Sequence, residues 1–466
     1  MPEIGTFVRT SLRWWIFTVI LVADVLDLLS TTVTNIVVPS ILRDLHAPQS
    51  LTPWLGSAYS LTLGSVLVIG GRIGDRYGYR RSFLIGGAGF AAASLLCALA
   101  WNPASIVAAR LLQGVFGALL IPQGFSILLR AFPRAELGRV FGLFGPLMAV
   151  GSISGPVVAG LLIQADPLGL GWRGVFVANA VLGIAVFLAG ARVLPRDPGR
   201  RAAVIDPLAS VLLMLGVLGV LGGLVQSAGH GWDAQPVLAL ILGVAGLALF
   251  TLHQLRSDDP LLAPSLFRDR GFVTGVLLGA LFSAVVAGLL YVTSLYLQDG
   301  RGLAPSQTAE TMAPLSVGII IASFSARGLI ARHGRRVVAA GLALIGAGVL
   351  CYLTLVGADG RSIWPLTAPL FLCGLGMGCC FGSIFAVALG DVGAEQSGSA
   401  SGTLNAVQQL SNAVGAAGVS TIFLAVGAAH GMRAGVFTVL LAVLGVIVLC
   451  GLCLPLLPRT AAADRH

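Results

Sequence analysis

The sequence contains no lysine, and charge of either sign is scarce. Charged residues make up 10% of the 466 residues, and all 28 basic residues are arginine, whereas about a quarter of the residues of a typical soluble domain are charged. Hydrophobic residues reach 56%, and the mean hydropathy is +0.94. This shortage of charge excludes a water-soluble protein of ordinary composition and predicts a membrane protein.

The sequence also lacks the motifs of several enzyme classes. It has no Gly-rich phosphate loop, so ATP-driven transport by this chain alone is not expected. The His residues are scattered without metal-ligand spacing. Cys450 and Cys453 have the spacing of a redox pair, but they lie in an apolar run with no charge to activate a thiol. We therefore expect no enzyme, no cofactor and no metal site.

Apolar runs long enough to cross a bilayer recur along the whole sequence. Each must be a helix, because a helix satisfies its own backbone hydrogen bonds in lipid. The fourteen predicted spans lie at 15–38, 53–71, 82–101, 105–129, 138–164, 174–194, 207–227, 236–254, 272–297, 311–331, 336–357, 363–389, 399–428 and 434–457.

The arginines are distributed unevenly over the loops between these spans. When the N-terminus is placed in the cytoplasm, most of them fall on cytoplasmic loops or at the cytoplasmic ends of spans, and Arg110 alone falls within a span away from such an end. The positive-inside rule therefore predicts that both termini are cytoplasmic. The net charge of +9 is explained by this topology, so no nucleic-acid partner is expected. The exclusive use of Arg, with abundant Ala and Gly, suggests a GC-rich genome. We expect the chain to lie in a bacterial cytoplasmic (inner) membrane.

Two polar segments, at residues 195–206 and 255–270, divide the sequence. They predict an N-terminal six-helix bundle (1–194), a linker with two inserted helices (195–260) and a C-terminal six-helix bundle with a short tail (261–466). The halves carry a repeat, because the Gly and Arg spacing at 71–81 recurs in degraded form at 327–336. Paired six-helix halves are typical of transporters whose site lies between the repeats.

Two carboxylates lie near the middle of the first span, and this is costly in a bilayer. Asp24 and Asp27 are three residues apart, so they share one helix face. Buried carboxyl groups can bind a proton near neutral pH, and Arg110 would favour its release. We expect these three residues to couple transport to protons. The alternative is a neutralised cluster that holds helices together, although intramembrane ionisable residues are functional by default.

A basic loop follows the second span and is the most specific motif in the sequence. Its glycines permit a tight turn between two helices, and one acidic residue, Asp75, lies among its arginines. That acid could pair with an Arg or lie at the N-terminus of another helix. We expect a conformational gate formed by Gly71, Gly74, Asp75, Arg76, Gly78, Arg80 and Arg81. The alternative is a topology anchor, which would not explain the repeat of the spacing in the second half.

The fifth span carries glycines at four-residue spacing and a Gly-Pro step, and such a pattern suits close packing. The proline would also kink the helix, so a gating role competes with simple packing. The residues are Gly151, Gly155, Pro156 and Gly160.

These motifs resemble those of the major facilitator superfamily, over nearly the whole chain. The basic loop resembles the signature loop of that family, and Arg110, Gln113, Gly114 and Gly117 resemble its fourth-helix pattern. The glycines of the fifth span resemble its antiporter pattern, which marks exporters. Fourteen helices with an inserted pair point to the drug:proton antiporter branch, the multidrug efflux type. The first span departs from that branch, because Ser30 replaces an expected second acid.

The resemblance implies a secondary transporter that works by alternating access. We expect proton-coupled export of lipophilic, possibly cationic drugs or antibiotics by a monomer in the lipid bilayer. Candidate residues of the substrate cavity are Asn35, Tyr59, Gln113 and Gln409. The alternatives are a dedicated exporter of a single natural product for self-resistance, a proton-coupled importer and a membrane protein that transports nothing.

Overall fold

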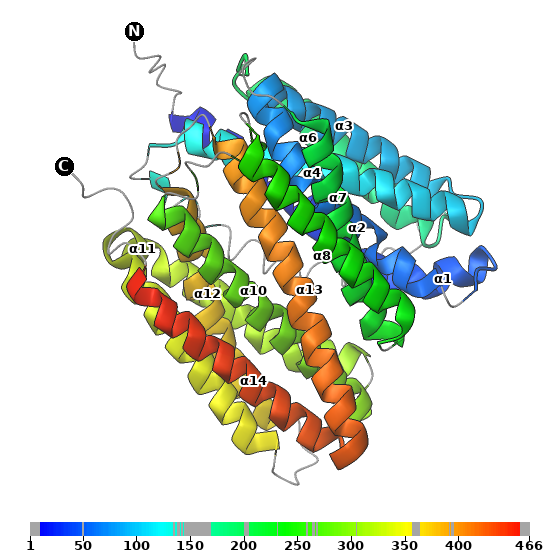
Figure 1. The fold of residues 1–466 in the computed structure, drawn as a ribbon, viewed down its shortest axis with the longest axis vertical. Helices are drawn as coiled ribbons and strands as arrows, with labels where there is room; N and C mark the ends of the chain where they lie inside the picture. The colour runs from blue at the N-terminus through cyan, green and yellow to red at the C-terminus, as the bar shows by residue number, and fades with distance from the viewer. Residues whose placement is uncertain are drawn as a thin grey trace. The chain divides into compact units, whose positions relative to one another are not determined.

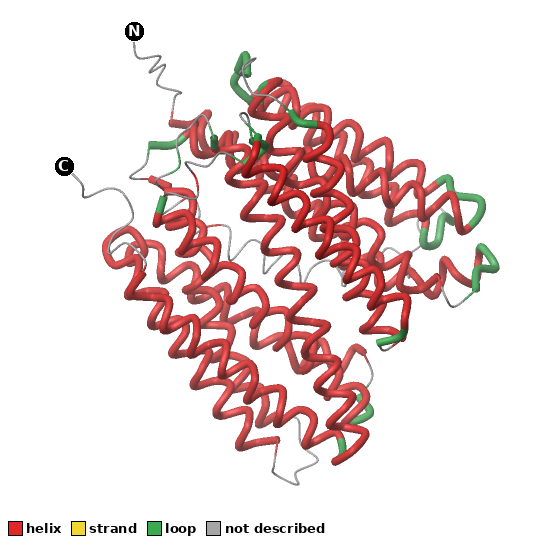
Figure 2. Tube along the Cα trace, viewed as in Figure 1, coloured by secondary structure: helices red, strands yellow, loops and turns green. Residues whose placement is uncertain are grey.

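The described part of the chain is almost entirely helical. No strand occurs within it, as Figure 2 shows. The computed structural model describes residues 10–48, 51–133, 136–137, 140, 143, 169–199, 205–230, 232–257, 260–262, 266, 269–303, 305–356, 364–390, 392 and 396–456.

The chain divides into two compact units. The first comprises residues 1–140, 155–205 and 393–402, and the second comprises 141–154, 206–392 and 403–466. Each unit therefore draws on both halves of the sequence, because the first turns of one late helix belong to the first unit. The predicted division into bundles at residues 194 and 260 stays a prediction.

The first unit is built on helices that pack around α4. The helix α4 contacts both α2 and α3, and α1 and α3 both contact α6. A cluster of buried apolar side chains, including Ile41, Ile106 and Phe176, joins α1, α4 and α6 at one end. The helices are α1 (Thr10–Asp44), α2 (Thr52–Tyr77), α3 (Tyr79–Ala98), α4 (Pro103–Ala131) and α6 (Arg173–Val193), coloured blue to green in Figure 1.

Polar side chains join α1 to α6 where α1 ends. Asp44 accepts hydrogen bonds from Arg173 Nη1 at 2.6 Å and from Trp172 Nε1 at 3.1 Å. These bonds hold the pKa of the Asp44 carboxyl below its ordinary value. Arg173 also stacks on the Trp172 ring and donates to the carbonyl oxygen of Ala100 at 3.1 Å, so three chain segments meet at one guanidinium.

The second unit is built on α11 and α12, and both the first and the second part of α11 pack against α12. Their large apolar core includes Phe282, Ile345, Met377 and Phe423. The helices of this unit are α7 (Pro207–His230), α8 (Ala234–Arg256), α10 (Arg270–Leu295), α11 (Pro305–Val356), α12 (Thr367–Gly390), α13 (Ser397–His430) beyond its first turns, and α14 (Met432–Cys453).

Eleven helices of the described residues are long and apolar enough to cross a membrane. They match eleven of the fourteen predicted spans. Of the other three, 15–38 lies within α1, 138–164 lies largely outside the described residues, and 311–331 corresponds to the shorter apolar helix Glu310–Ser325. The all-helical membrane architecture is confirmed, and the count of fourteen spans stays a prediction.

The prediction of two spans, 311–331 and 336–357, agrees with the packing of α11 (Pro305–Val356). Leu315 packs against Gly374 and Gly341 against Gly376, whereas residues that far apart on a straight helix would be about 39 Å from one another, so the chain reverses direction between them. In the first copy of the repeat, Gly78 breaks the helix with a φ of 97°, which residues other than Gly rarely adopt. Gly334 at the corresponding position remains helical in α11, so the two copies of the repeat have different backbones.

The inserted helices α7 and α8 form a tightly packed pair. Their backbones approach at Gly219 and Gly243, where an added Cβ at Gly243 would lie 2.7 Å from the carbonyl carbon of Gly219. The pair also covers part of α13, since Val220 and Leu224 pack against Ala417. Trp232 Nε1 donates to Thr421 Oγ1 at 2.9 Å, which attaches the turn between the inserted helices to α13.

We expect Gly243→Ala to destabilise the second unit, because a methyl group at this position would force α7 and α8 apart. Overpacking of this kind costs about 1–3 kcal/mol, which should lower the thermal unfolding midpoint of the purified protein by several degrees. Gly222→Ala is the matched control, because nothing lies within 4 Å of its added Cβ. Equal midpoints for the two variants would contradict the close packing of α7 and α8.

Candidate functional site

The candidate site is a buried polar network between α1, α2, α3 and α4. Tyr59 on α2 donates its hydroxyl hydrogen to Asp27 on α1. The guanidinium of Arg110 on α4 lies over the ring of the same tyrosine, 4.8 Å from its centroid. Tyr59 and Arg110 are both fully buried. Tyr59 therefore lies between Asp27 and Arg110: its hydroxyl contacts the carboxylate, and the face of its ring contacts the guanidinium.

Arg110 makes its hydrogen bonds to neutral acceptors. Its Nη1 donates to Ser30 Oγ at 2.9 Å and to Gln113 Oε1 at 2.6 Å, and its Nη2 donates to the carbonyl oxygen of Ser30 at 3.2 Å. Gln113 is held in turn, because its Nε2 donates to Ser94 Oγ on α3 at 2.8 Å. Ser30, where an acid is expected by resemblance, is thus a direct partner of the arginine.

Glycines on α4 allow this arrangement. An added Cβ at Gly114 would lie 2.9 Å from Thr62 Cβ and 3.0 Å from the backbone nitrogen of Leu63. At Gly117 it would lie 2.8 Å from the Tyr59 hydroxyl oxygen. Small residues here bring α4 close to α2, next to the turn that carries Arg110.

Asp24 lies one turn before Asp27 on α1 and is 4% exposed. Its Oδ2 has no hydrogen-bond partner among the described residues, so this carboxyl group is poorly stabilised as an anion. A buried charge without partners is costly, and a carboxyl group avoids the cost by binding a proton. Asp27, in contrast, is only partly buried and has both the Tyr59 hydroxyl and the nearby guanidinium charge.

The basic loop forms a second polar cluster, at the break between α2 and α3. Asp75 accepts hydrogen bonds from the backbone amides of Gly398 and Ser399 at 3.1 and 3.0 Å, in the first turn of α13. The acid therefore lies at the N-terminus of another helix, the second of the two arrangements considered above. A carboxylate there compensates the helix dipole and pairs amides that the helix leaves unpaired.

Tyr79 joins the parts of this cluster. Its hydroxyl donates to Asp75 Oδ1 at 2.7 Å and accepts from Ser397 Oγ at 3.3 Å. Arg130 of α4 stacks on its ring at 4.3 Å and donates to its hydroxyl at 3.4 Å. The sequence motif emphasised Gly and Arg and did not include this tyrosine.

The other residues of the loop have separate placements. An added Cβ at Gly74 would lie 2.7 Å from Gln123 Cδ, and Gly71 approaches the backbone of Gly398. Arg80 Nη2 donates to the carbonyl oxygen of Ala191 at 2.6 Å. Arg76 lies over the Tyr77 ring, and Arg81 is exposed.

Some predicted site residues cannot be placed in these clusters. Gly151, Gly155, Pro156 and Gly160 lie outside the described residues, so the role of the fifth span stays a prediction. Asn35 lies within α1, but its side chain is outside the described part. Gln409 is partly buried on α13, in the second unit. Tyr59 and Gln113, predicted for a substrate cavity, have their polar groups engaged in the Arg110 network.

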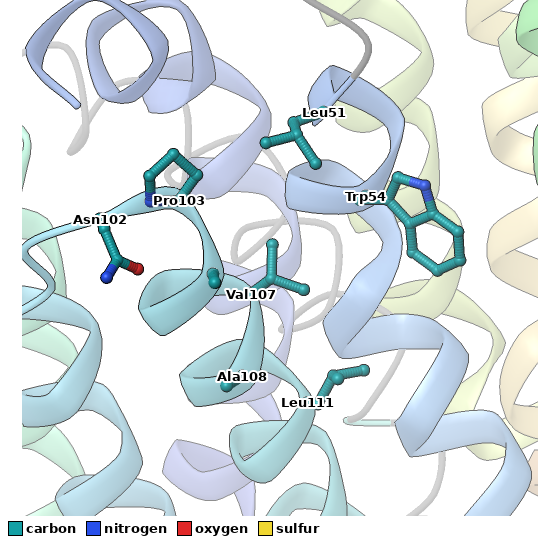
Figure 3. A pocket seen from close by; sticks show the side chains of 8 residues that line it. Leu51, Trp54, Asn102, Pro103, Val107, Ala108 and Leu111 are labelled. Carbon is teal, nitrogen blue, oxygen red and sulfur yellow. The ribbon is translucent and has the colours of Figure 1, made fainter. Parts of the chain in front are cut away.

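An apolar groove of about 600 Å³ lies between the first turns of α2 and α4. Figure 3 shows Leu51 and Val107 pointing toward one another across it, with the Trp54 ring at its edge. Asn102 is its one polar lining residue, and that side chain accepts a hydrogen bond from Ser105 N at 2.7 Å to cap α4. The groove therefore offers apolar contact and little chemistry, in contrast to the Arg110 network.

Comparison with known proteins identifies the class. The model of the Major Facilitator Superfamily matches residues 20–416, and the chain belongs to this family of transporters. The human organic anion transporter MFSD10 (TETRAN) shares its fold, with a TM-score of 0.70 at 18% identity over 95% of this chain and 99% of that one.

The particular relatives are antibiotic and multidrug resistance transporters. A probable actinorhodin transporter of Streptomyces coelicolor is 38% identical over 88% of this chain and 72% of its own length. The puromycin resistance protein pur8 of Streptomyces alboniger is 34% identical over 90% and 83%. The multidrug resistance protein Stp of Mycobacterium tuberculosis is 29% identical over 85% and 73%. The predicted family is confirmed.

We expect Gln113→Ala to destabilise the first unit, because it removes an acceptor from a fully buried guanidinium and the hydrogen bond that Ser94 accepts. Losing a partner of a buried polar group costs about 1–3 kcal/mol, which should lower the thermal unfolding midpoint. Gln409→Ala, a truncation of the same side chain at a partly buried position, is the control and should change the midpoint little. A midpoint for Gln113→Ala equal to that of the native protein would contradict the network.

Proposed function

We propose that the chain exports lipophilic drugs or antibiotics in exchange for protons. The observation that carries this proposal is the Asp27–Tyr59–Arg110 arrangement. A guanidinium in a low-dielectric interior needs a compensating anion nearby, and Asp27 supplies it through the tyrosine and not by direct contact. Protonation of Asp27 would remove that compensation, so proton binding and the position of Arg110 depend on each other.

In this proposal the proton and the substrate alternate in one cycle. With Asp27 ionised, the Tyr59 hydroxyl and the charge of Arg110 stabilise the carboxylate. When a proton arrives from outside, the hydrogen bond from Tyr59 loses its charge-assisted character, and Arg110 must find compensation elsewhere. We infer that this change favours the state that releases substrate. Asp24, with its unpaired oxygen, is a second position that can hold a proton.

The Asp75 contact supplies the gate in this proposal. The first turn of α13 is held by two amide hydrogen bonds to Asp75, whereas most of α13 belongs to the second unit. Breaking these bonds would free the start of α13 from the first unit. We infer that one of the two alternating states contains this contact and the other lacks it. The protein would act as a monomer in a bacterial cytoplasmic membrane, with both termini in the cytoplasm.

A second candidate is a dedicated exporter of a single natural product. It is supported by the relatives named for actinorhodin and puromycin, while the relative named for multidrug resistance supports the first candidate. The few charges inside the first unit suit an apolar or weakly cationic compound in both cases. A proton-coupled importer has no comparable support.

We expect the native protein, expressed in bacteria that lack their own pumps, to lower accumulation of a lipophilic cationic dye and to raise resistance to lipophilic antibiotics. An uncoupler should abolish both effects, because the proton gradient is the proposed driving force. Resistance to one natural product without dye efflux would favour the dedicated exporter. Well-expressed protein that changes neither accumulation nor resistance to any compound of the panel would contradict export.

We expect Asp27→Asn to abolish gradient-driven export of whichever compound the native protein exports, while leaving the protein folded. The substitution keeps the shape and removes the charge that titrates. Export should be measured in inverted membrane vesicles with an imposed proton gradient. Asp44→Asn is the matched control, because Asp44 pairs with Arg173 outside the network and should retain export. Full export by Asp27→Asn would rule out its role in coupling.

A further inference from the structure

The segment that follows α6 returns to the basic loop through one acidic residue. Asp197 accepts a hydrogen bond from the backbone amide of Tyr79 through Oδ2 at 2.7 Å and from that of Arg80 through Oδ1 at 3.1 Å. These amides belong to the first turn of α3, which has no cap from its own preceding residue, Gly78. Asp197 is therefore the cap of α3, supplied from 117 residues further along the chain.

The backbone around Asp197 fits closely against the same turn. Gly199 has a φ of 67°, and an added Cβ there would lie 2.5 Å from the backbone nitrogen of Gly78. An added Cβ at Gly78 would lie 2.7 Å from the carbonyl oxygen of Asp197. Two glycines with positive φ thus allow the two segments to touch, which brings the Asp197 carboxylate to the start of α3.

Tyr79 connects this cap to the gate. Its backbone amide is held by Asp197, and its hydroxyl donates to Asp75, which holds the amides of Gly398 and Ser399. The first turns of α3 and α13 are therefore each capped by an aspartate, and the two caps share one tyrosine. All of these residues belong to the first unit.

We propose that Asp197 is a positioning residue for the gate: it fixes the start of α3, and thereby holds the Tyr79 hydroxyl where it orients Asp75 toward α13. The proposal rests on the proposed role of the Asp75 contact in the transport cycle. It assigns a task to the segment after α6, which the sequence analysis treated only as a linker.

The test is hydrogen exchange of backbone amides in the purified full-length protein, without substrate or gradient. Asp197→Ala should speed exchange in peptides that cover residues 79–82 and also in those that cover 397–400. A rise of about fivefold corresponds to a lost cap of about 1 kcal/mol. Asp75→Ala should speed exchange at 397–400 and leave 79–82 nearly unchanged, since the α3 cap does not pass through Asp75.

Asp269→Ala is the matched control. Asp269 caps α10 at similar distances from the adjacent position, its Oδ1 accepting from Gly271 N at 2.7 Å and from Phe272 N at 3.2 Å. This variant should speed exchange only at the start of α10. Asp197→Asn keeps an acceptor oxygen and should retain much of the protection from exchange at residues 79–82 and 397–400. This variant replaces Asp197→Ala in the test if the alanine variant does not fold.

The result that overturns the proposal is faster exchange at 79–82 with unchanged exchange at 397–400, because Asp197 would then be a local cap only. Unchanged exchange at both sites would overturn it as well. The outcome is independent of export, so a chain that transports no tested compound can still confirm or contradict the coupling of the two caps. In a chain that exports, Asp197→Ala should lower the turnover rate more than it changes the apparent substrate affinity.

Discussion

A buried guanidinium group is the constraint on which the first unit depends. Arg110 is fully enclosed, so an unpaired donor on it is costly and its charge must be balanced within the protein. Ser30 and Gln113 accept hydrogen bonds from its two terminal nitrogens, Ser94 holds Gln113 in position, and Nε has no hydrogen-bond partner among the described residues. None of these partners carries charge. The balancing carboxylate is one aromatic ring away, and this separation allows the carboxylate to titrate without breaking a direct ion pair.

The few carboxylates of the chain also stabilise the starts of helices. In the described part of the chain, four aspartates accept backbone amide hydrogens from the first turns of helices: Asp75 from α13, Asp197 from α3, Asp206 from α7 and Asp269 from α10. Each compensates amides that a helix leaves unpaired in its first turn. Acids scattered among the arginines of the predicted cytoplasmic loops are thus tied to specific helices. A loop with net positive charge can therefore set the membrane topology and also be held in place through its acidic residues.

Much of this was predictable from the sequence, and the limits have physical causes. Apolar length identifies helices, and the rarity of intramembrane charge singled out Asp24, Asp27 and Arg110. Spacing within one helix cannot show which residues of other helices contact these three. The hydrogen bond from Tyr59 to Asp27 and the one from Gln113 to Ser94 were therefore missed. Tyr79 was missed because a tyrosine near a membrane end usually marks the interface, and Asp197 was missed because its partners lie 117 and 118 residues away in the sequence. The two spans expected on either side of Gly334 both pack on α12, but Gly334 lacks the positive φ that Gly78 adopts, because glycine permits that conformation without requiring it.

The inserted helices have a consequence for how such a chain can change in length. Among the described residues, the part of α13 that packs against the inserted helices includes Leu410, Ala413 and Ala417, and the hydroxyl of Thr421 accepts a hydrogen bond from Trp232. A threonine hydroxyl can bond to its own helix, and this one also donates to the carbonyl oxygen of Ala417 at 2.8 Å. Removal of α7 and α8 would expose these apolar side chains to lipid, which tolerates them, and would leave the Thr421 hydroxyl bonded within its own helix. This packing gives a physical route between shorter and longer versions of one architecture.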